Sequence, residues 1–134
     1  MRALLSIIGV TVFLSACSGS KLTKDDVRLA LGDVRSFSAS GSFLIGQKLD
    51  GKVTDTFFLS QAQQLEEKFN GAKKDLDAPA GPLEYRRLKV LELAIQGADD
   101  LHQVRYGEVT REKEADLLAL SAAAKNLEEQ LKDD

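Results

Sequence analysis

The chain has 134 residues, a length that suits one domain and leaves little room for two. Its 18 basic and 21 acidic residues give a net charge of −3, without the basic stripe that nucleic-acid binding requires. Tryptophan is absent and aromatic residues make up 6% of the chain, which argues against a surface that stacks sugars or bases. The composition therefore indicates a small globular protein that does not bind nucleic acid.

The first sixteen residues have the pattern of a cleavable export signal. Arg2 is their only charged residue, and an almost wholly apolar run follows it from residue 3 to residue 14. About a dozen apolar residues are too few for a resident transmembrane helix, but they suit the central region of a signal peptide. Removal of residues 1–16 leaves 17 basic and 21 acidic residues, a net charge of −4.

The apolar run ends in Leu14-Ser15-Ala16-Cys17, and Cys17 is the only cysteine of the chain. This segment resembles the lipobox of bacterial lipoproteins, and the resemblance covers only the first 17 residues. It implies that a signal peptidase cuts between Ala16 and Cys17, that the Cys17 thiol receives a diacylglyceryl group, and that the new amine is often acylated. Two or three acyl chains hold a protein stably on a membrane, whereas one chain holds it only marginally.

The residue after the cysteine bears on location. In lipoproteins of bacteria with two membranes, an Asp at this position commonly means retention at the inner membrane, so Ser18 favours the outer membrane, facing the periplasm. Residues 18–22 form a short polar tether, which places the domain of residues 23–134 close to the membrane. The alternatives are an ordinary signal peptide with a chance cysteine, or an uncleaved signal anchor. With one cysteine no internal disulfide can form, so packing alone must stabilise the fold.

Four segments of the mature chain show helical periodicity, and helix breakers separate them. They cover residues 24–49, 55–76, 82–106 and 111–131. Residues 77–82 hold two prolines and a glycine and form the clearest linker. Helices of about 22–26 residues would each be about 33–39 Å long. Similar lengths and short connections predict an all-α, up-down four-helix bundle.

Two segments leave a local alternative open. Residues 36–42 are rich in serine and could form a loop, but the apolar stripe continues in phase on both sides, which favours a helix. Asp50-Gly51 suits the type I′ turn of a β-hairpin. The flanking runs Phe43-Leu44-Ile45 and Phe57-Phe58-Leu59 do not alternate with polar residues, which favours two helices there as well.

The first and third connections look alike and lie 56 residues apart. Gly51 and Gly107 could each end a helix in the left-handed conformation, and Thr54 and Thr110 could each cap the next helix. The same offset matches Val34 with Val90, Ser38 with Ala94, Gly41 with Gly97 and Ile45 with Leu101. The pattern favours two tandem αα-hairpins, although the match fades in the second helix of each pair, and chance similarity stays open.

Residues able to carry chemistry are few. His102 is the only histidine, and Asp99 lies three residues before it, so the two could share a helix face and touch a metal. Two ligands do not make a site, and we expect a surface histidine instead. There is no glycine-rich phosphate loop and no Gly-x-Ser-x-Gly motif. The sequence predicts no enzymatic activity, no metal and no cofactor.

A local basic cluster consists of Arg86, Arg87 and Lys89. It could meet anionic headgroups or an acidic partner, but we expect an ordinary solvated helix face.

The leading functional prediction is a membrane-anchored, non-enzymatic module that binds another protein of the cell envelope. An inhibitor that acts by surface contact would look the same. The alternative is a carrier that holds a small apolar ligand inside the bundle, with room left by Gly41 and Gly97. Such a cavity would be lined by Phe37, Ile45, Phe58 and Leu91. The same two glycines could instead let helices approach closely.

Overall fold

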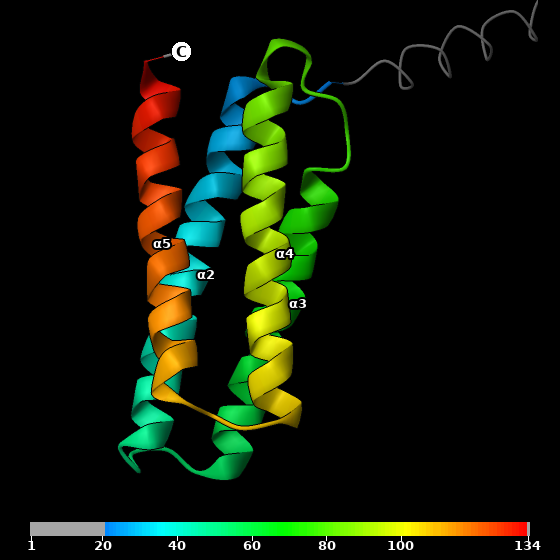
Figure 1. The fold of residues 1–134 in the computed structure, drawn as a ribbon. Coiled ribbons are helices and arrows are strands. Elements are labelled where there is room, and N and C mark those ends of the chain that lie inside the picture. Colours follow the sequence, from blue (N-terminus) through cyan, green and yellow to red (C-terminus); the bar gives the residue numbers. More distant parts are fainter. Residues whose placement is uncertain (1–20, 134) are drawn as a thin grey trace, which may run out of the picture.

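The computed structural model describes residues 21–133, which form an antiparallel bundle of four long helices (Figure 1). The helices are α2 (Lys24–Leu49), α3 (Asp55–Asp75), α4 (Glu84–Tyr106) and α5 (Arg111–Lys132), and a turn of 3₁₀ helix, η1 (Gly81–Leu83), precedes α4. The predicted all-α four-helix bundle is confirmed, and its boundaries agree within one or two residues. The signal peptide, the lipobox with Ala16 and Cys17, and most of the tether lie outside the described residues.

Threonine caps begin three of the four helices. The Thr23 hydroxyl accepts a hydrogen bond from the Asp26 backbone N–H, and the Asp26 carboxylate accepts one from the Thr23 N–H, which makes a complete capping box. The hydroxyl groups of Thr54 and Thr110 each accept a hydrogen bond from the backbone N–H three residues later, at 3.1 and 3.2 Å. These bonds satisfy N–H groups that have no partner within the helix.

The two glycines that follow α2 and α4 behave differently. Gly51 has φ +70°, in the left-handed region, as predicted. The prediction for Gly107 is wrong, because its φ is −137° and the chain runs extended across the end of the bundle to α5 (Figure 1). A Cβ on Gly107 would lie 2.8 Å from the Gln103 carbonyl oxygen, so glycine is needed there for space. No strand occurs within residues 21–133, and the β-hairpin alternative at residues 50–51 is wrong.

The helices pack as two close pairs. α2 packs most extensively against α5, and α3 against α4, while the sequential neighbours α2 and α3, and α4 and α5, touch less. In the two predicted hairpins, α2 corresponds to α4 and α3 corresponds to α5. The close pair of α2 with α5 is therefore the equivalent of the close pair of α4 with α3. The packing is therefore consistent with two similar hairpins that interlock.

Residues matched by the 56-residue offset occupy equivalent places in the core. Val34, Val90, Ser38, Ala94, Ile45 and Leu101 are all at most 1% exposed. The buried Ser38 hydroxyl donates to the Val34 carbonyl oxygen at 2.7 Å, which satisfies its polar group within α2. Residues 36–42 are helical throughout, as preferred from the sequence.

Gly41 and Gly97 let helices approach closely. A Cβ on Gly41 would lie 3.0 Å from Leu117 Cδ1 and 3.5 Å from Leu101 Cδ2. A Cβ on Gly97 would lie 2.5 Å from two ring carbons of Phe69, which is itself fully buried. Side chains of the neighbouring helices therefore fill the space that each glycine leaves.

Candidate functional site

The described chain begins and ends at the same end of the bundle (Figure 1). The Leu22 backbone N–H donates to the Pro79 carbonyl oxygen at 2.9 Å, which ties the incoming chain to the connection between α3 and α4. None of the helices within residues 21–133 combines the length and the apolar character needed to cross a membrane.

His102 pairs with a residue that the sequence did not single out. Its Nδ1 lies 2.8 Å from Oε1 of Glu66 on α3, and Arg105 binds the other oxygen of the same carboxylate. The Tyr106 ring lies 4.7 Å from the His102 ring and 4.9 Å from the Arg105 guanidinium. Among the described residues no group of three or more side chains is arranged to hold a metal ion. The cluster joins α3 to α4, and Asp99 takes no part in it.

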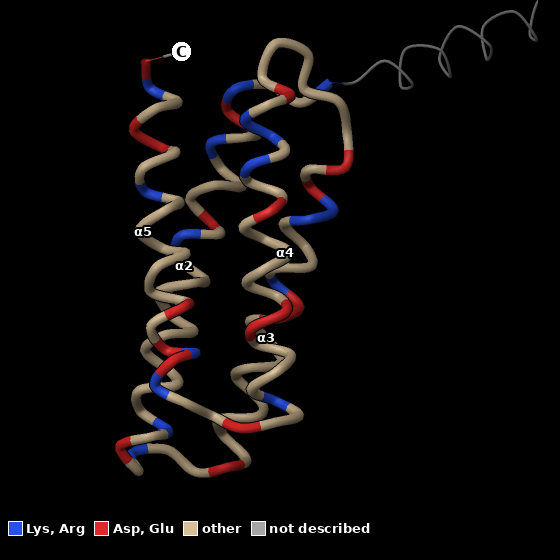
Figure 2. Tube along the Cα trace, viewed as in Figure 1, with Lys and Arg blue, Asp and Glu red and all other residues tan. Residues whose placement is uncertain are grey.

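The basic cluster at the start of α4 is engaged within the protein. Arg87 binds the Glu84 carboxylate and donates to a carbonyl oxygen at the end of α3. Arg86 donates to Gln130 Oε1 on α5 at 2.7 Å, and Lys89 lies 3.8 Å from a carboxylate one turn further on. The bond from Arg87 lowers the pKa of the Glu84 carboxyl below its usual value. These contacts hold helix ends together. Acidic and basic residues are interspersed along all four helices (Figure 2).

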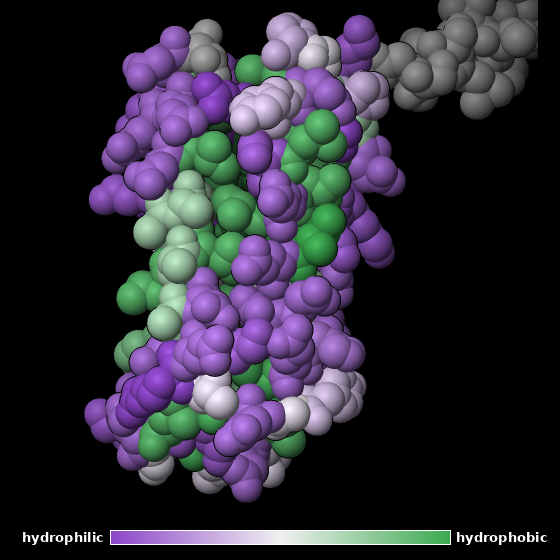
Figure 3. All heavy atoms as spheres, viewed as in Figure 1, coloured by the Kyte–Doolittle hydropathy of each residue, from purple (hydrophilic) through white to green (hydrophobic). Residues whose placement is uncertain are grey.

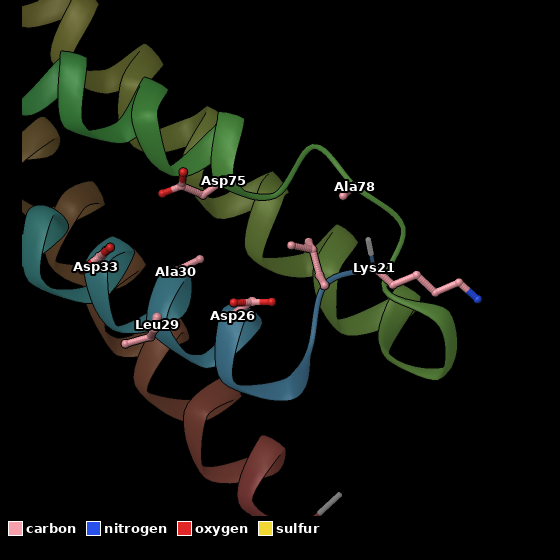
Figure 4. A pocket seen from close by; sticks show the side chains of 8 residues that line it. Lys21, Asp26, Leu29, Ala30, Asp33, Asp75 and Ala78 are labelled. Atoms are coloured by element: carbon pink, nitrogen blue, oxygen red, sulfur yellow. The ribbon is translucent and has the colours of Figure 1, made fainter. Parts of the chain in front are cut away.

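A hollow of about 450 Å³ near the start of α2 is rich in carboxylates (Figure 4). Asp26 and Asp33 project from α2, and Asp75 from the end of α3. Asp26 already serves the capping box, and its hydrogen bonds with Thr23 lower its pKa. The hollow therefore offers no chemistry beyond its role at the helix end.

Asp100 and Lys113 form a buried ion pair between α4 and α5. Lys113 Nζ lies 3.0 Å from Asp100 Oδ1, while Asp100 Oδ2 is buried without a hydrogen-bond partner in the part of the chain that the structure describes. Asp100 is 4% exposed. Burial raises the pKa of Asp100 although Lys113 opposes the shift, and the hydrogen bond to Asp100 raises the pKa of Lys113.

Hydrophobic residues also gather over the face formed by α4 and α5 (Figure 3). Exposed apolar residues of these helices include Leu88 (49%), Ile95 (45%) and Leu118 (60%). In the same view hydrophilic residues lie between and around the hydrophobic ones (Figure 3).

A groove of about 430 Å³ lies between α2 and α3 and is named here the α2–α3 groove. Two aromatic rings stand open in it, Phe43 with 69% and Phe57 with 49% of its surface exposed. Its lining consists of Ser40, Phe43, Leu44, Gln47, Val53, Phe57, Gln61, Leu65 and Lys68. The lining therefore contains five apolar residues, three neutral polar residues, one cation and no carboxylate.

No known protein family, curated protein or solved structure matches this chain. Its function must be argued from its own residues.

The second hairpin has a different contact at the position equivalent to the α2–α3 groove. The 56-residue offset takes Leu44 to Asp100 and Phe57 to Lys113, the two residues of the buried ion pair. Both α3 and α5 begin directly after a capping threonine at the same offset, so the positions are equivalent. The second hairpin closes with an ion pair where the first leaves an open apolar groove.

A signal for the groove was present in the sequence. A helix turns about 100° per residue, so three successive apolar residues cannot all face the core. In the run of residues 57–59, Phe58 is 2% exposed, while Phe57 and Leu59 are 49% and 44% exposed. The apolar runs at residues 43–45 and 57–59 could have been used to predict exposed aromatic rings.

Proposed function

We propose that this protein is a bacterial lipoprotein, anchored through lipid on Cys17, whose helical bundle binds another protein of the cell envelope without catalysing a reaction. The lipobox supports the anchor, and Ser18 in place of an Asp supports a location at the outer membrane, facing the periplasm. The observation that carries the interaction role is the α2–α3 groove with its exposed rings of Phe43 and Phe57. Burial of a Phe side chain contributes about 1.5–3 kcal/mol, and aromatic residues often dominate the binding energy of interfaces.

The position of the groove relative to the anchor supports this role. The chain enters at the start of α2, and Phe43 lies about 28 Å further along that helix at 1.5 Å per residue. A tether of residues 18–22 would keep the entry end close to the bilayer. The α2–α3 groove would then lie away from the headgroups, within reach of another envelope protein.

Packing inside the bundle favours this proposal over a carrier of a small apolar ligand. Ile45 and Phe58 are at most 2% exposed in the packed core, and Phe37 packs edge-to-face on Phe69 with ring centroids 5.6 Å apart. The space beside Gly41 and Gly97 is filled by side chains. Both glycines therefore act in helix packing.

The anchor is tested by the intact mass of the protein extracted from membranes. We expect the mass of residues 17–134 plus acyl groups. Cys17→Ser should abolish the added mass and the mature membrane-bound form, because the lipid is attached to the thiol. Ser18→Ala is the matched control and should be processed normally. A wild-type protein that keeps residues 1–16 unmodified, or a Cys17→Ser protein that still fractionates as a mature membrane protein, would refute the anchor.

A further inference from the structure

The lining of the α2–α3 groove contains a single charge, and it is positive. Lys68 is the only charged residue of the lining, and Lys52 immediately precedes the lining residue Val53. Within residues 21–133 neither lysine forms an ion pair, and Lys68 Nζ contacts only an aromatic ring, that of Phe37, at 5.8 Å from its centroid.

Acidic residues lie close to these lysines in the sequence but outside the lining, and one of them, Glu67 beside Lys68, accepts a hydrogen bond from Gln63. Asp55 is bound by Lys48, and Asp50 by Arg111 at 2.6 Å. The lining of the groove itself therefore carries one positive charge and no carboxylate, on a chain whose net charge is −3.

The shape of the groove suits a short helix. Its α3 wall is formed by Phe57, Gln61, Leu65 and Lys68, at steps of four, four and three residues. This wall is about 17 Å long at 1.5 Å per residue, or about three helical turns. A groove of this kind accepts the apolar face of an amphipathic helix.

Resting on the proposed function, we infer that the segment bound in the α2–α3 groove is an amphipathic helix of a partner protein. Its apolar face covers Phe43 and Phe57, and a carboxylate at one end meets Lys68. Salt confines the attraction to about 8 Å at physiological ionic strength, so the carboxylate must lie within about one turn of the contact. The ion pair sets the choice and orientation of the partner, and the aromatic rings provide most of the affinity.

Charge also argues against a second copy of this chain in the groove. A symmetric contact brings the same surface of both copies together. It would place two copies of Lys68 and two of Lys52 in one interface whose lining offers no carboxylate. Like charges at an interface oppose association.

The test places a photo-crosslinking phenylalanine derivative at residue 57 of the full chain, in the cells that make it. The matched control carries the derivative at Leu118, which is 60% exposed on α5. We expect an adduct from residue 57 that is absent from residue 118. The linked peptide, mapped by mass spectrometry, should be an amphipathic helix with Asp or Glu within one turn of the contact. Lys68→Glu should lower the adduct yield about threefold, and Lys125→Glu, on an exposed face of α5, should leave it unchanged.

The outcomes separate this inference from the proposed function. A linked segment without a nearby carboxylate, an adduct to a second copy or to lipid, or an unchanged yield in Lys68→Glu would overturn the inferred partner chemistry. An adduct to a protein segment that lacks a carboxylate near the contact would still support the α2–α3 groove as a docking site. Equal adducts from residues 57 and 118, or none from residue 57, would remove the observation that carries the interaction role itself.

Discussion

At the scale of single residues, Gly97 decides how closely α4 approaches α3. A methyl group there would lie 2.5 Å from the Phe69 ring, which is fully buried and cannot move aside. Gly97→Ala should therefore lower the free energy of unfolding by about 1–3 kcal/mol, measured by urea denaturation, although Ala favours helix more than Gly does.

The control for Gly97 lies on the facing helix. A Cβ on Gly71 of α3 would have no atom within 4 Å, so Gly71→Ala should raise the free energy of unfolding by about 0.5–1 kcal/mol. If both variants were stabilised alike, the close approach of α3 and α4 at Gly97 would be wrong.

Lys113 compensates the buried carboxylate of Asp100. Lys113→Met leaves that carboxylate without its partner and should lower the free energy of unfolding at neutral pH by about 3 kcal/mol. The folded state already raises the pKa of Asp100 above its usual 3.8, so Asp100 binds a proton more tightly when folded than when unfolded. Its unfavourable contribution therefore grows as the pH rises through the folded pKa.

The pH dependence provides the check on this pair. Urea denaturation of Lys113→Met should show a smaller loss at pH 4 than at pH 7, because the neutral carboxyl needs no cation. The double variant Asp100→Leu with Lys113→Met, which introduces the Leu found at the equivalent position 44, should recover most of the stability. An equal loss at both pH values would contradict the role assigned to Asp100.

At the scale of the helices, capping threonines define where α2, α3 and α5 begin. Thr54→Ala removes the acceptor for the Phe57 N–H and should cost about 1 kcal/mol, seen as a lower thermal unfolding midpoint. Thr56→Ala, the exposed second residue of the same helix, is the control and should leave the midpoint nearly unchanged. Equal effects would mean that the side-chain cap does not stabilise α3.

The close pair of α2 and α5 depends on small residues and on hydroxyl groups. The Ser42 hydroxyl donates to the Glu114 carbonyl oxygen at 2.9 Å, and the Ser121 hydroxyl donates to the Arg35 carbonyl oxygen at 3.1 Å. These bonds run in both directions between the helices. Within the serine-rich residues 36–42, Ser42 thus finds its partner on α5, while Ser38 bonds within α2, so both of these buried hydroxyl groups are satisfied in a helix.

At the scale of the whole molecule, substitution of an exposed aromatic residue should impair partner binding, and substitution of a buried one should lower the free energy of unfolding. Phe43→Ser should change the free energy of unfolding by no more than about 0.5 kcal/mol, because the ring is 69% exposed, but should abolish crosslinking to a partner from residue 57. Phe58→Ser, 2% exposed, should cost about 3–5 kcal/mol by chemical denaturation. A Phe43→Ser protein that unfolds would show that the α2–α3 groove belongs to the core.

The features predicted correctly from the sequence depend on neighbours close along the chain. Helix periodicity repeats every 3.6 residues, and the caps at Thr23, Thr54 and Thr110 act over three residues. Four helices, and the starting points of the three that have a threonine cap, could therefore be predicted. The lipobox around Cys17 is also a local pattern, and it stays a prediction.

The tertiary structure decided what depends on residues far apart in the chain. His102 finds Glu66 across 36 residues instead of Asp99 on its own helix, and α2 packs closest against α5 rather than against the helix that follows it. Periodicity could separate the buried Phe58 from the exposed Phe57, but only the packing of α2 beside α3 brings Phe43 and Phe57 into one groove. The sequence by itself thus determined the elements, and packing between them determined the candidate groove, because a helix forms from local bonds whereas a groove exists only between two helices.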